Sequence, residues 1–446
     1  MDEKPTIFAL SSGAGKAAVA VIRISGAAAS RIVELMAGPL PRKRTTVLRK
    51  LRHPATREVL DDALVFWSAA PKSETGEDMA ELQVHGGRAV VRSVLEALSG
   101  IQGCRLAEPG EFTRRAFETG RLDLAEAEGL ADLIDAETEA QRRQAMVQAG
   151  GANSKLYEGW RGKLLNAAAL VEAAIDFSDE SDVSSDAIEL SRRVVEGLAE
   201  EVRRHLDDGH RGELVRDGFR VALLGPPNAG KSSLLNALAR RDAAIVSEEA
   251  GTTRDVIEVR LDLGGLPVVI SDTAGLRVAE GAVEQEGIRR ALSAASEADL
   301  ILWLTEIHDA LPALPDELRD SAEKTLHVLS KADQLGEGRP PALPDDLMAI
   351  SAKTGQGVPE LAERIAAIAR ERVGSSHEPV ISTLRHRRLI EACSEALASF
   401  LSGKADDTEL RAEDLRRAAA ALGRVTGRID AEDILDQVFS RFCIGK

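Results

Sequence analysis

The chain has 446 residues, of which 44% are hydrophobic and 29% charged, and its formal net charge is −16. These values are typical of a globular protein of about three domains. They argue against a protein that coats nucleic acid through a broadly basic surface. The chain begins without the basic and apolar regions of a secretory signal, no apolar run approaches the ~20 residues that span a bilayer, and the cysteines are too scattered for a disulfide framework or zinc motif. We therefore expect a cytoplasmic protein without a membrane segment.

Segments of different composition follow one another along the chain. The first contains short β-type runs: VAVIRIS at 19–25, ALVFW at 63–67 and AELQVHGG at 80–87. Ala/Glu/Leu-rich helical sequence then stands before and after a region where β-runs alternate with helical runs, the pattern of a parallel sheet covered by helices. We expect a multidomain α/β protein with an N-terminal α+β domain, a discontinuous all-α domain and an inserted α/β domain. The predicted boundaries are 1–118, 119–216, 217–373 and 374–446.

Three short basic stretches interrupt this acidic chain. They are PRKR at 41–44, the pair Arg114-Arg115, and RHRR at 385–388. The ordinary interpretation of each is a solvated helix or loop face. Local contact with RNA stays an alternative.

A phosphate-binding motif lies at the start of the inserted domain. RVALLGPPNAGKSSLLNAL at 220–238 predicts a strand, a GxxxxGKS loop and a helix. Its two outer glycines let backbone N–H groups turn toward phosphates at the positive end of the helix. Lys231 supplies a positive charge to the β/γ oxygens, and Ser232 offers a hydroxyl to Mg²⁺. The predicted binders of GTP or GDP here are Asn228, Ala229, Gly230, Lys231, Ser232 and Ser233.

Later motifs specify guanine as the base. GTTRD at 251–255 supplies threonines for a first switch, and VVISDTAG at 268–275 predicts a strand ending in an aspartate suited to the water shell of the metal. Asp333 can accept both N1–H and N2–H of guanine, donors that adenine lacks, and ISAK at 350–353 completes the base pocket. Five motifs in this order predict a Ras-like P-loop GTPase. The further candidates are Gly251, Thr252, Thr253, Asp272, Thr273, Ala274, Gly275, Ser330, Lys331, Asp333, Ser351, Ala352 and Lys353.

Two positions depart from the usual motifs. The base motif begins with Ser330 instead of asparagine, so we expect weaker nucleotide affinity, with the choice of base retained through Asp333. Leu276 follows DTAG where Ras-like enzymes carry a glutamine that orients water, so another group must position the nucleophile.

Two nearby residues are candidates for the missing functions. Glu284 can order the attacking water, or it is an ordinary glutamate at a helix start. The side-chain carbonyl of Asn228 can hold a monovalent cation against the phosphates, where the ion would act as an arginine finger does, or it stabilises the loop turn. The residues alone leave both alternatives open.

The whole chain resembles the tRNA modification GTPase family MnmE, also called TrmE. The GTPase motifs carry part of the likeness. The other residues that carry it are VAVIRISG at 19–26, TGEDMAELQVHGG at 75–87, AEPGEFTRRAF at 107–117, GRLDLAEAEGLADLI at 120–134 and the final FCIGK.

The resemblance implies a folate-binding and dimerising N-terminal domain, a discontinuous helical domain and an inserted G domain. Proteins of this family are homodimers that associate with an FAD-containing partner, MnmG (GidA). Together they add a carboxymethylaminomethyl group to C5 of the wobble uridine (U34) of certain tRNAs. The implied cofactors are GTP, Mg²⁺, K⁺ and a methylene- or formyl-tetrahydrofolate, and K⁺-dependent pairing of G domains drives the cycle.

Site residues carry over from the family by position. Glu284 matches the catalytic glutamate, Ser232 and Thr253 match the Mg²⁺ ligands, and Ser247 stands where relatives usually have threonine. The matches to the K⁺ site are Asn228, Ser247, Glu249 and Thr252, and the segment around the ion adds Ser247, Glu248, Glu249 and Ala250 to the GTP-binding set. The matches to the folate site are Arg23, Glu81, Arg121 and Lys446. Glu81 suits the paired N–H donors of a pterin, and arginines suit the glutamate-tail carboxylates.

The C-terminal stretch GRIDAEDILDQVFSRFCIGK at 427–446 predicts a docked amphipathic helix that begins near Asp430 and stops at Gly445. Cys443 would then lie at the helix C-terminus, where the dipole disfavours a thiolate. Three roles compete for it. A prenylated cysteine does not fit the glycine and lysine that follow. A bystander thiol and a thiolate that adds to C6 of uridine, which makes C5 nucleophilic, both stay open.

Two other functions compete with the family assignment. The first is a ribosome-assembly GTPase, which shares the G motifs but needs a basic RNA-binding appendage. The second is a binding scaffold with vestigial hydrolysis, which Leu276 favours because leucine cannot orient water. The sequence does not specify the tRNAs modified, the amplitude of G-domain motion, the stoichiometry with the partner or the effect of Ser330.

Overall fold

The computed structural model describes most of the chain, which divides into two compact units. Unit 1 contains residues 1–131, 148–166 and 416–446, and unit 2 contains residues 132–147 and 167–415. The described residues are 4–176, 181–241, 244–245, 257–272, 292–308, 314, 316–335, 347–374, 378–403, 407–429, 432–440 and 442–446. Within these ranges no helix is both long and apolar enough to cross a membrane.

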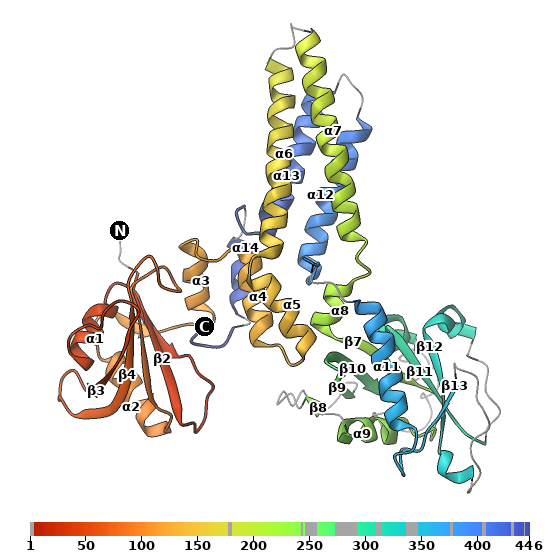
Figure 1. The fold of residues 1–446 in the computed structure, drawn as a ribbon, viewed down its shortest axis with the longest axis horizontal. Helices are drawn as coiled ribbons and strands as arrows, with labels where there is room; N and C mark the ends of the chain where they lie inside the picture. The colour runs from red at the N-terminus through yellow and green to blue at the C-terminus, as the bar shows by residue number, and fades with distance from the viewer. Residues whose placement is uncertain are drawn as a thin grey trace, which may run out of the picture. The chain divides into compact units, whose positions relative to one another are not determined.

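Unit 1 is built on a six-stranded sheet with the order β3-β4-β5-β2-β1-β6 (Figure 1). All neighbouring strands are antiparallel except β1 and β6, which run parallel. The runs predicted at 19–25, 63–67 and 80–87 lie within β2, β4 and, up to its last two residues, β5. The strands are β1 (Thr6–Leu10), β2 (Val19–Ser25), β3 (Thr46–Arg52), β4 (Val59–Ser68), β5 (Met79–His85) and β6 (Cys104–Leu106).

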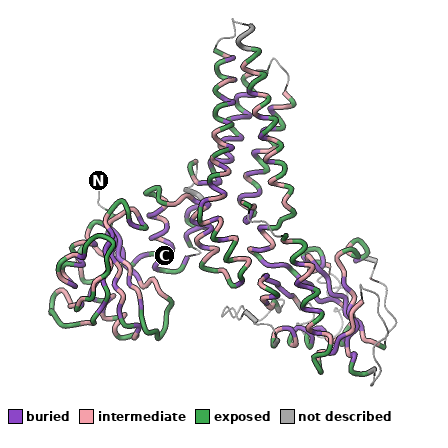
Figure 2. The backbone as a smooth tube through the Cα atoms, in the orientation of Figure 1, coloured by how far each residue is buried: buried purple, intermediate pink, exposed green. Residues whose placement is uncertain are grey.

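Two helices cover one face of this sheet, α1 (Ala29–Ala37) and α2 (Arg88–Ser99). Alternation along the strands decides which side chains meet them. In β2, Ile22 and Ile24 join the core with the apolar sides of both helices, while Arg23 between them faces the other way. Figure 2 shows this core as buried backbone along the strands. The other face presents polar residues of β2 and β5 beside a small apolar cluster of Ile7, Ala9, Ala107 and Phe112.

The C-terminal segment of the chain packs within the same unit. Leu435, Val438 and Phe439 of α14 are buried against Leu124 and other apolar residues of α4. Beyond α14, Ile444 forms an antiparallel bridge with Pro109, and the Ser11 hydroxyl donates to the Gly445 carbonyl at 2.7 Å. The expectation of a docked C-terminal segment is confirmed. The helices of this region are α3 (Glu111–Glu118), α4 (Leu124–Ile134) and α14 (Glu432–Phe439).

Unit 2 contains a seven-stranded sheet with the order β13-β12-β11-β7-β10-β9-β8. Strands β13, β12, β11, β7 and β10 are parallel, as the alternating pattern predicted, and β9 and β8 continue the sheet in antiparallel fashion. The strands are β7 (Phe219–Leu224), β8 (Ala244–Ile245), β9 (Ile257–Leu263), β10 (Leu266–Asp272), β11 (Leu300–Glu306), β12 (Thr325–Ser330) and β13 (Leu347–Ala349).

Helices bury both faces of this sheet, which explains the continuous apolar runs of its central strands. The largest core joins the sheet to α9 (Lys231–Arg241) and α11 (Val358–Val373). On the opposite face, Ile301 and Trp303 of β11 pack with Ala295 and Ala298. The remaining helices of the chain are α5 (Glu139–Ala149), α6 (Ala152–Asp176), α7 (Ser181–Leu206), α8 (Arg211–Asp217), α12 (Leu384–Ser402) and α13 (Thr408–Val425).

A buried arginine holds the segment that leads into the sheet of unit 2. Arg387 of α12 pairs with Asp208 at 2.8 Å and with Glu213 at 2.9 Å. Its guanidinium also donates to the Leu206 carbonyl at 3.2 Å. Since α8 directly precedes β7, this cluster fixes the entry of the chain into the sheet.

Candidate functional site

The phosphate-binding loop joins the C-terminal end of β7 to the N-terminus of α9, as predicted. Gly225 has φ +144°, and a Cβ at this position would overlap the Leu304 carbonyl oxygen of the neighbouring strand. Only glycine therefore lets the loop leave the sheet here. Asn228 adopts the left-handed conformation with φ 63° and is exposed, while Ala229 is fully buried. The loop backbone is thus turned so that its N–H groups gather at the start of a helix.

Lys231 lies inside this loop. Its side chain is buried, and Nζ donates to the carbonyl oxygens of Gly225 at 2.9 Å and Pro226 at 2.8 Å. The ammonium group is therefore held against the loop that is predicted to surround the phosphates. Ser232 and Ser233 follow at the exposed first turn of α9.

The predicted base-binding loops meet at the ends of β12 and β13. The Ser351 hydroxyl donates to Asp333 Oδ1 at 2.6 Å, and the amide of Ala332 donates to the Ile350 carbonyl at 2.9 Å. The hydrogen bond from Ser351 lowers the pKa of Asp333 from its ordinary value, with a smaller contribution from nearby lysines. The exposed carboxylate is therefore an ionised acceptor at neutral pH. Lys331 pairs with Glu306, a residue that the sequence motifs did not single out.

Ser330 lies between the base-binding loop and the phosphate loop, in the position where the usual motif has asparagine. Its side chain is buried, and the hydroxyl donates to the Thr305 carbonyl at 3.1 Å. A Cβ added at Gly230 of the phosphate loop would lie 3.9 Å from the Ser330 hydroxyl. An asparagine, which is longer by an amide group, would reach the phosphate loop from this position.

The Ser330→Asn change should therefore tighten nucleotide binding. One new hydrogen bond between the base loop and the phosphate loop contributes about 0.5–1.5 kcal/mol, so GDP should dissociate about 3- to 10-fold more slowly. Stopped-flow release of a fluorescent GDP analogue measures this rate, with the unfolding temperature as a check on packing. An unchanged or faster release from a folded variant would contradict the tether.

The structure brings together the parts of the nucleotide site that it describes. The phosphate loop follows β7, Asp272 ends β10, Ser330 ends β12, and Ser351 follows β13, all at the C-terminal edge of parallel strands. This edge is where α/β sheets bind ligands. Ala352 and Lys353 continue the loop after Ser351. The predicted residues outside the described part are Ser247, Glu248, Glu249, Ala250, Gly251, Thr252, Thr253, Thr273, Ala274, Gly275 and Glu284.

A second predicted site lies on the polar face of the sheet in unit 1. Arg23 and Glu81 face each other across β2 and β5, and their side chains pair at 3.0 Å. Arg23 also pairs with Glu74 at 2.9 Å and stands over the Phe112 ring, 5.8 Å from its centroid. Arg121 is exposed in the turn after α3. The two residues expected to hold different ends of one ligand are thus direct neighbours.

Sequence reasoning missed the network that supports this face. Ser25 bonds to Thr75 and to Glu77, both at 2.7 Å, and Arg115 pairs with Glu77 at 3.0 Å. The Thr119 hydroxyl donates to the Thr75 carbonyl at 2.8 Å, which brings the turn that carries Arg121 to the loop that carries Glu74. Thr75, Glu77 and Arg115 lie in the stretches 75–87 and 107–117 that carry the family likeness, but nothing in those stretches indicates that the three residues meet.

The end of the chain reaches the same sheet, but Cys443 is not placed as predicted. Helix α14 ends at Phe439, four residues before Cys443, because the amide of Phe442 bonds three residues back to the Phe439 carbonyl and so forms a turn. The predicted helix, which would have continued to Gly445, therefore stops earlier, and Cys443 does not lie at a helix C-terminus. Cys443 is exposed, and the Lys446 amide donates to its carbonyl at 3.3 Å.

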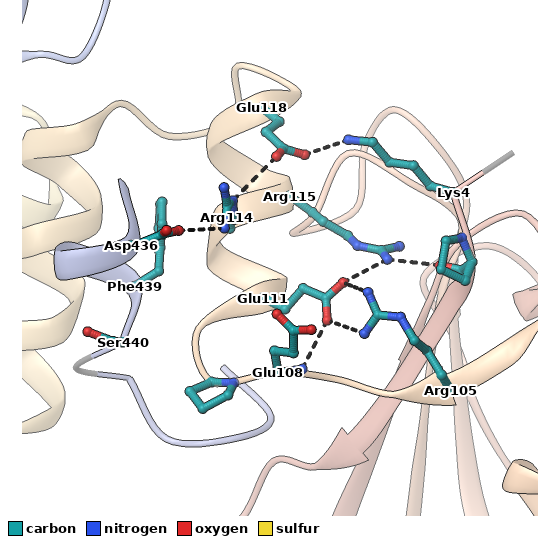
Figure 3. A pocket seen from close by; sticks show the side chains of 12 residues that line it. Lys4, Arg105, Glu108, Glu111, Arg114, Arg115, Glu118, Asp436, Phe439 and Ser440 are labelled. Atoms are coloured by element: carbon teal, nitrogen blue, oxygen red, sulfur yellow. Dashed lines mark hydrogen bonds and ion pairs between the residues drawn. The ribbon is translucent and has the colours of Figure 1, made fainter. Parts of the chain in front are cut away.

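A cavity of about 610 Å³ lies beside α3 and α14 (Figure 3). Of the ion pairs that line it, Arg114–Asp436 joins the two helices at 3.0 Å. Burial raises the pKa of Glu111, but hydrogen bonds from Arg105, the Glu108 amide and Arg115 outweigh it and hold that pKa below its ordinary value. Since its cations and carboxylates pair with each other, this cavity braces the C-terminal segment rather than offering free charges. The pairs are Lys4–Glu118, Arg105–Glu111, Arg115–Glu111 and Arg114–Asp436.

The sheet, phosphate loop and paired base loops of unit 2 define a P-loop domain of the GTPase type. Two family models match the chain: "GTP-binding protein TrmE N-terminus" over residues 6–121 and "MnmE helical domain" over residues 124–443. The tRNA modification GTPase MnmE of Parvibaculum lavamentivorans is 52% identical over 450 residues, covering 99% of this chain and 100% of its own length. The chain belongs to the tRNA modification GTPase MnmE family, which confirms the predicted family and fold class.

A second relative matches the full chain, whereas a solved structure matches only part of it. The MnmE protein of Maricaulis maris is 51% identical over 448 residues, and the match covers 99% of each chain. Among solved structures, the G domain of the T. maritima FeoB iron transporter is 25% identical and covers 34% of this chain and 98% of its own, with a TM-score of 0.26. The family assignment rests on the full-length relatives.

Proposed function

We propose that this protein hydrolyses GTP and couples the hydrolysis to modification of C5 of the wobble uridine in tRNA. The observation that carries the proposal is that about half of the residues are identical to those of tRNA modification GTPases along the full length of the chain. The nucleotide half of the function is supported by Lys231, buried in its loop, and by the ionised Asp333 in the base pocket. An enzyme that keeps both groups in place is suited to bind and discriminate GTP.

The nucleotide chemistry follows from the residues of the G domain. Ser232 and Thr253 would hold Mg²⁺ through hydroxyl oxygens, the kind of ligand that this ion prefers. Asn228, Ser247, Glu249 and Thr252 offer oxygens for K⁺, which when bound supplies positive charge beside the β–γ bridge. Asn228 is exposed on the phosphate loop, in keeping with this role. Glu284 then orients the attacking water, which Leu276 has no polar group to do.

The modification half belongs to the polar face of the N-terminal sheet. Arg23 and Glu81, with Arg121 and Lys446, would bind a one-carbon tetrahydrofolate. Arg23 and Glu81 lie in direct contact, so the two side chains would face the same end of the ligand, where the Glu81 carboxylate suits the amino-amide edge of a pterin. Cys443, exposed on the docked segment, is the candidate nucleophile toward uridine. The FAD-containing partner MnmG supplies the redox chemistry, and a homodimer pairs the G domains.

The function is tested by analysing tRNA nucleosides from a strain that lacks this gene. We expect wobble uridines without their carboxymethylaminomethyl group, and restoration by the intact gene. Normal modification at C5 in the deletion strain would overturn the proposal. A ribosome-assembly role would instead show as a defect in ribosomal subunits with unchanged tRNA.

The role of Glu284 is tested by turnover in two salts. The Glu284→Ala variant should lose hydrolysis by about 100-fold or more, because no other group positions the water, while GTP binding stays the same. The unaltered protein should turn over faster in KCl than in NaCl of equal ionic strength. Equal and negligible rates in both salts would indicate the scaffold with vestigial hydrolysis.

A further inference from the structure

One stretch of the N-terminal domain differs sharply in charge from the rest of this acidic chain. Residues 35–57 contain seven Lys or Arg residues and no Asp or Glu, although the chain as a whole has 73 acidic and 57 basic residues. The motif PRKR at 41–44 lies inside this stretch, and the sequence left open whether it is a solvated face or contacts RNA. The stretch is therefore a local reversal of the overall charge.

The fold displays this stretch along an open edge. Strand β3 is the terminal strand of its sheet, so one side of its backbone has no neighbouring strand. We call the cations on and beside this strand the basic edge. All are exposed except Arg52, which is half-buried. The basic edge consists of Arg42, Lys43, Arg44, Lys50, Arg52, Arg57 and Lys72.

Backbone carbonyls accept hydrogen bonds from Arg44, Arg52 and Arg57 of the basic edge. Arg44 donates to the Lys72 carbonyl at 3.0 Å, which draws Lys72 to the start of the strand. Arg52 donates to the Arg57 carbonyl at 3.1 Å, and Arg57 donates to the Leu35 carbonyl at 2.7 Å. A carbonyl orients a guanidinium without cancelling its charge, and each guanidinium has five N–H donors to share. The basic edge is thus both ordered and positive.

Nearby carboxylates neutralise little of this charge. Lys50 pairs with Asp62 at 3.2 Å, but Asp61 is taken by His85, whose ring and amide both bond to it at 2.7 Å. In the part of the chain that the structure describes, the side chains of Arg42 and Lys43 make no ion pair. At least these two cations are available to an outside anion.

Protection of an open strand edge does not explain the whole set. Lysine on an edge strand discourages pairing with another chain, which accounts for Lys50. Arg42, Lys43 and Lys72, however, lie on loops beside the strand rather than on it. From Arg44 to Arg52 the cations extend over eight residues, or about 26 Å at ~3.3 Å per residue. A line of charge of this length matches a polymer of phosphates better than a single small anion.

We propose that the basic edge binds the sugar–phosphate backbone of the tRNA substrate. This inference rests on the proposed function, because it assumes that tRNA is the macromolecule acted upon. Phosphate contacts of this kind fix orientation and carry no sequence information. The basic edge therefore positions tRNA on the N-terminal domain, whereas other residues choose the nucleotide to be modified.

The test compares two double variants of the full-length protein that change the net charge equally. Arg42→Glu with Lys43→Glu reverses two cations of the basic edge that carry no structural hydrogen bond from their side chains. Arg192→Glu with Arg193→Glu reverses two cations on α7, a half-buried one and an exposed one, each paired within its own helix to a glutamate. Binding of unfractionated tRNA is measured over a range of KCl concentrations, and GTP hydrolysis and circular dichroism confirm that each variant is folded.

We expect the basic-edge variant to bind tRNA about tenfold or more weakly, and the slope of log K against log salt to fall by about 1.5, as two lost phosphate contacts require. The α7 variant should keep most of the affinity and the slope. Equal affinity and slope for the basic-edge variant and the unaltered protein would overturn the inference, as would equal losses in both variants. The nucleoside analysis of the deletion strain is independent of this result, so failure of the basic edge would leave the proposed function standing.

Discussion

Replacement of Asp333 by asparagine should convert a GTP-binding protein into one that prefers xanthosine triphosphate. In the proposed base pocket the carboxylate would accept two N–H groups of guanine. Each such charge-assisted bond contributes about 1.5–3 kcal/mol, so GTP should bind about 100-fold to 10⁴-fold more weakly to Asp333→Asn. Xanthine carries an oxygen in place of the amino group, and the new amide can donate to it. Titration with fluorescent GTP and XTP analogues, together with turnover of both, measures the exchange.

Asp320→Asn is the matched control, because Asp320 is an exposed carboxylate in the same domain outside the base pocket. Its removal changes the charge equally and should leave GTP affinity unchanged. Since the hydrogen bond from Ser351 lowers the pKa of Asp333, base selection in the unaltered protein should persist as the pH falls to the ordinary aspartate range and fail only below it. Undiminished GTP affinity in Asp333→Asn would show that another group reads the base.

Substitution of Gly445 by alanine should abolish most tRNA modification while GTP turnover stays within about twofold. Gly445 has φ +102°, and a Cβ there would overlap the Leu10 carbonyl oxygen. The clash is between a Cβ fixed to the backbone at Gly445 and backbone atoms of Leu10, which cannot rotate away as a side chain can. The segment with Cys443 and Lys446 should therefore leave the sheet and lose the hydrogen bond from Ser11. Adverse φ alone costs about 1–3 kcal/mol. Nucleoside mass spectrometry measures modification, and hydrogen exchange over residues 435–446 measures undocking.

Gly103→Ala is the matched control, because it places alanine at an unfavourable positive φ without a steric overlap of the added Cβ. Gly103 also has a positive φ of +83°, but an added Cβ would meet nothing within 4 Å. This variant should lose a little stability and keep modification. Unimpaired modification by Gly445→Ala would mean that the docked segment has no part in the chemistry.

Much of the nucleotide domain could be predicted from the sequence because its signals are local. The strand, loop and helix around Lys231 are contiguous, so one short motif predicts their order. The steric need for glycine at position 225 could not be predicted, because it comes from the Leu304 carbonyl of a neighbouring strand. The position of Asp333 after a strand was equally local. The bond between Ser351 and Asp333 was not predicted as such, although the motif order implied that the two loops meet.

The site on the N-terminal sheet was harder to foresee because its contacts join distant residues. Arg23 and Glu81 are paired by strand register, which depends on the order of six strands and not on any local pattern. Glu74 and Arg115 belong to a loop and a helix whose approach only the packed fold specifies. The apolar residues Leu435, Val438, Phe439 and Phe442 predicted docking correctly, yet the same spacing hid the turn that ends α14 at Phe439.

The hydrogen bond between Ser11 and Gly445 joins residues 434 positions apart, so it sets an order of events during synthesis. The strands of the N-terminal sheet leave the ribosome early, and domains generally fold as they emerge. The segment that docks on them follows only after the nucleotide-binding domain has been made. A prematurely terminated chain would therefore fold its first sheet without Cys443 and Lys446, the two residues of this segment that we propose for the modifying surface.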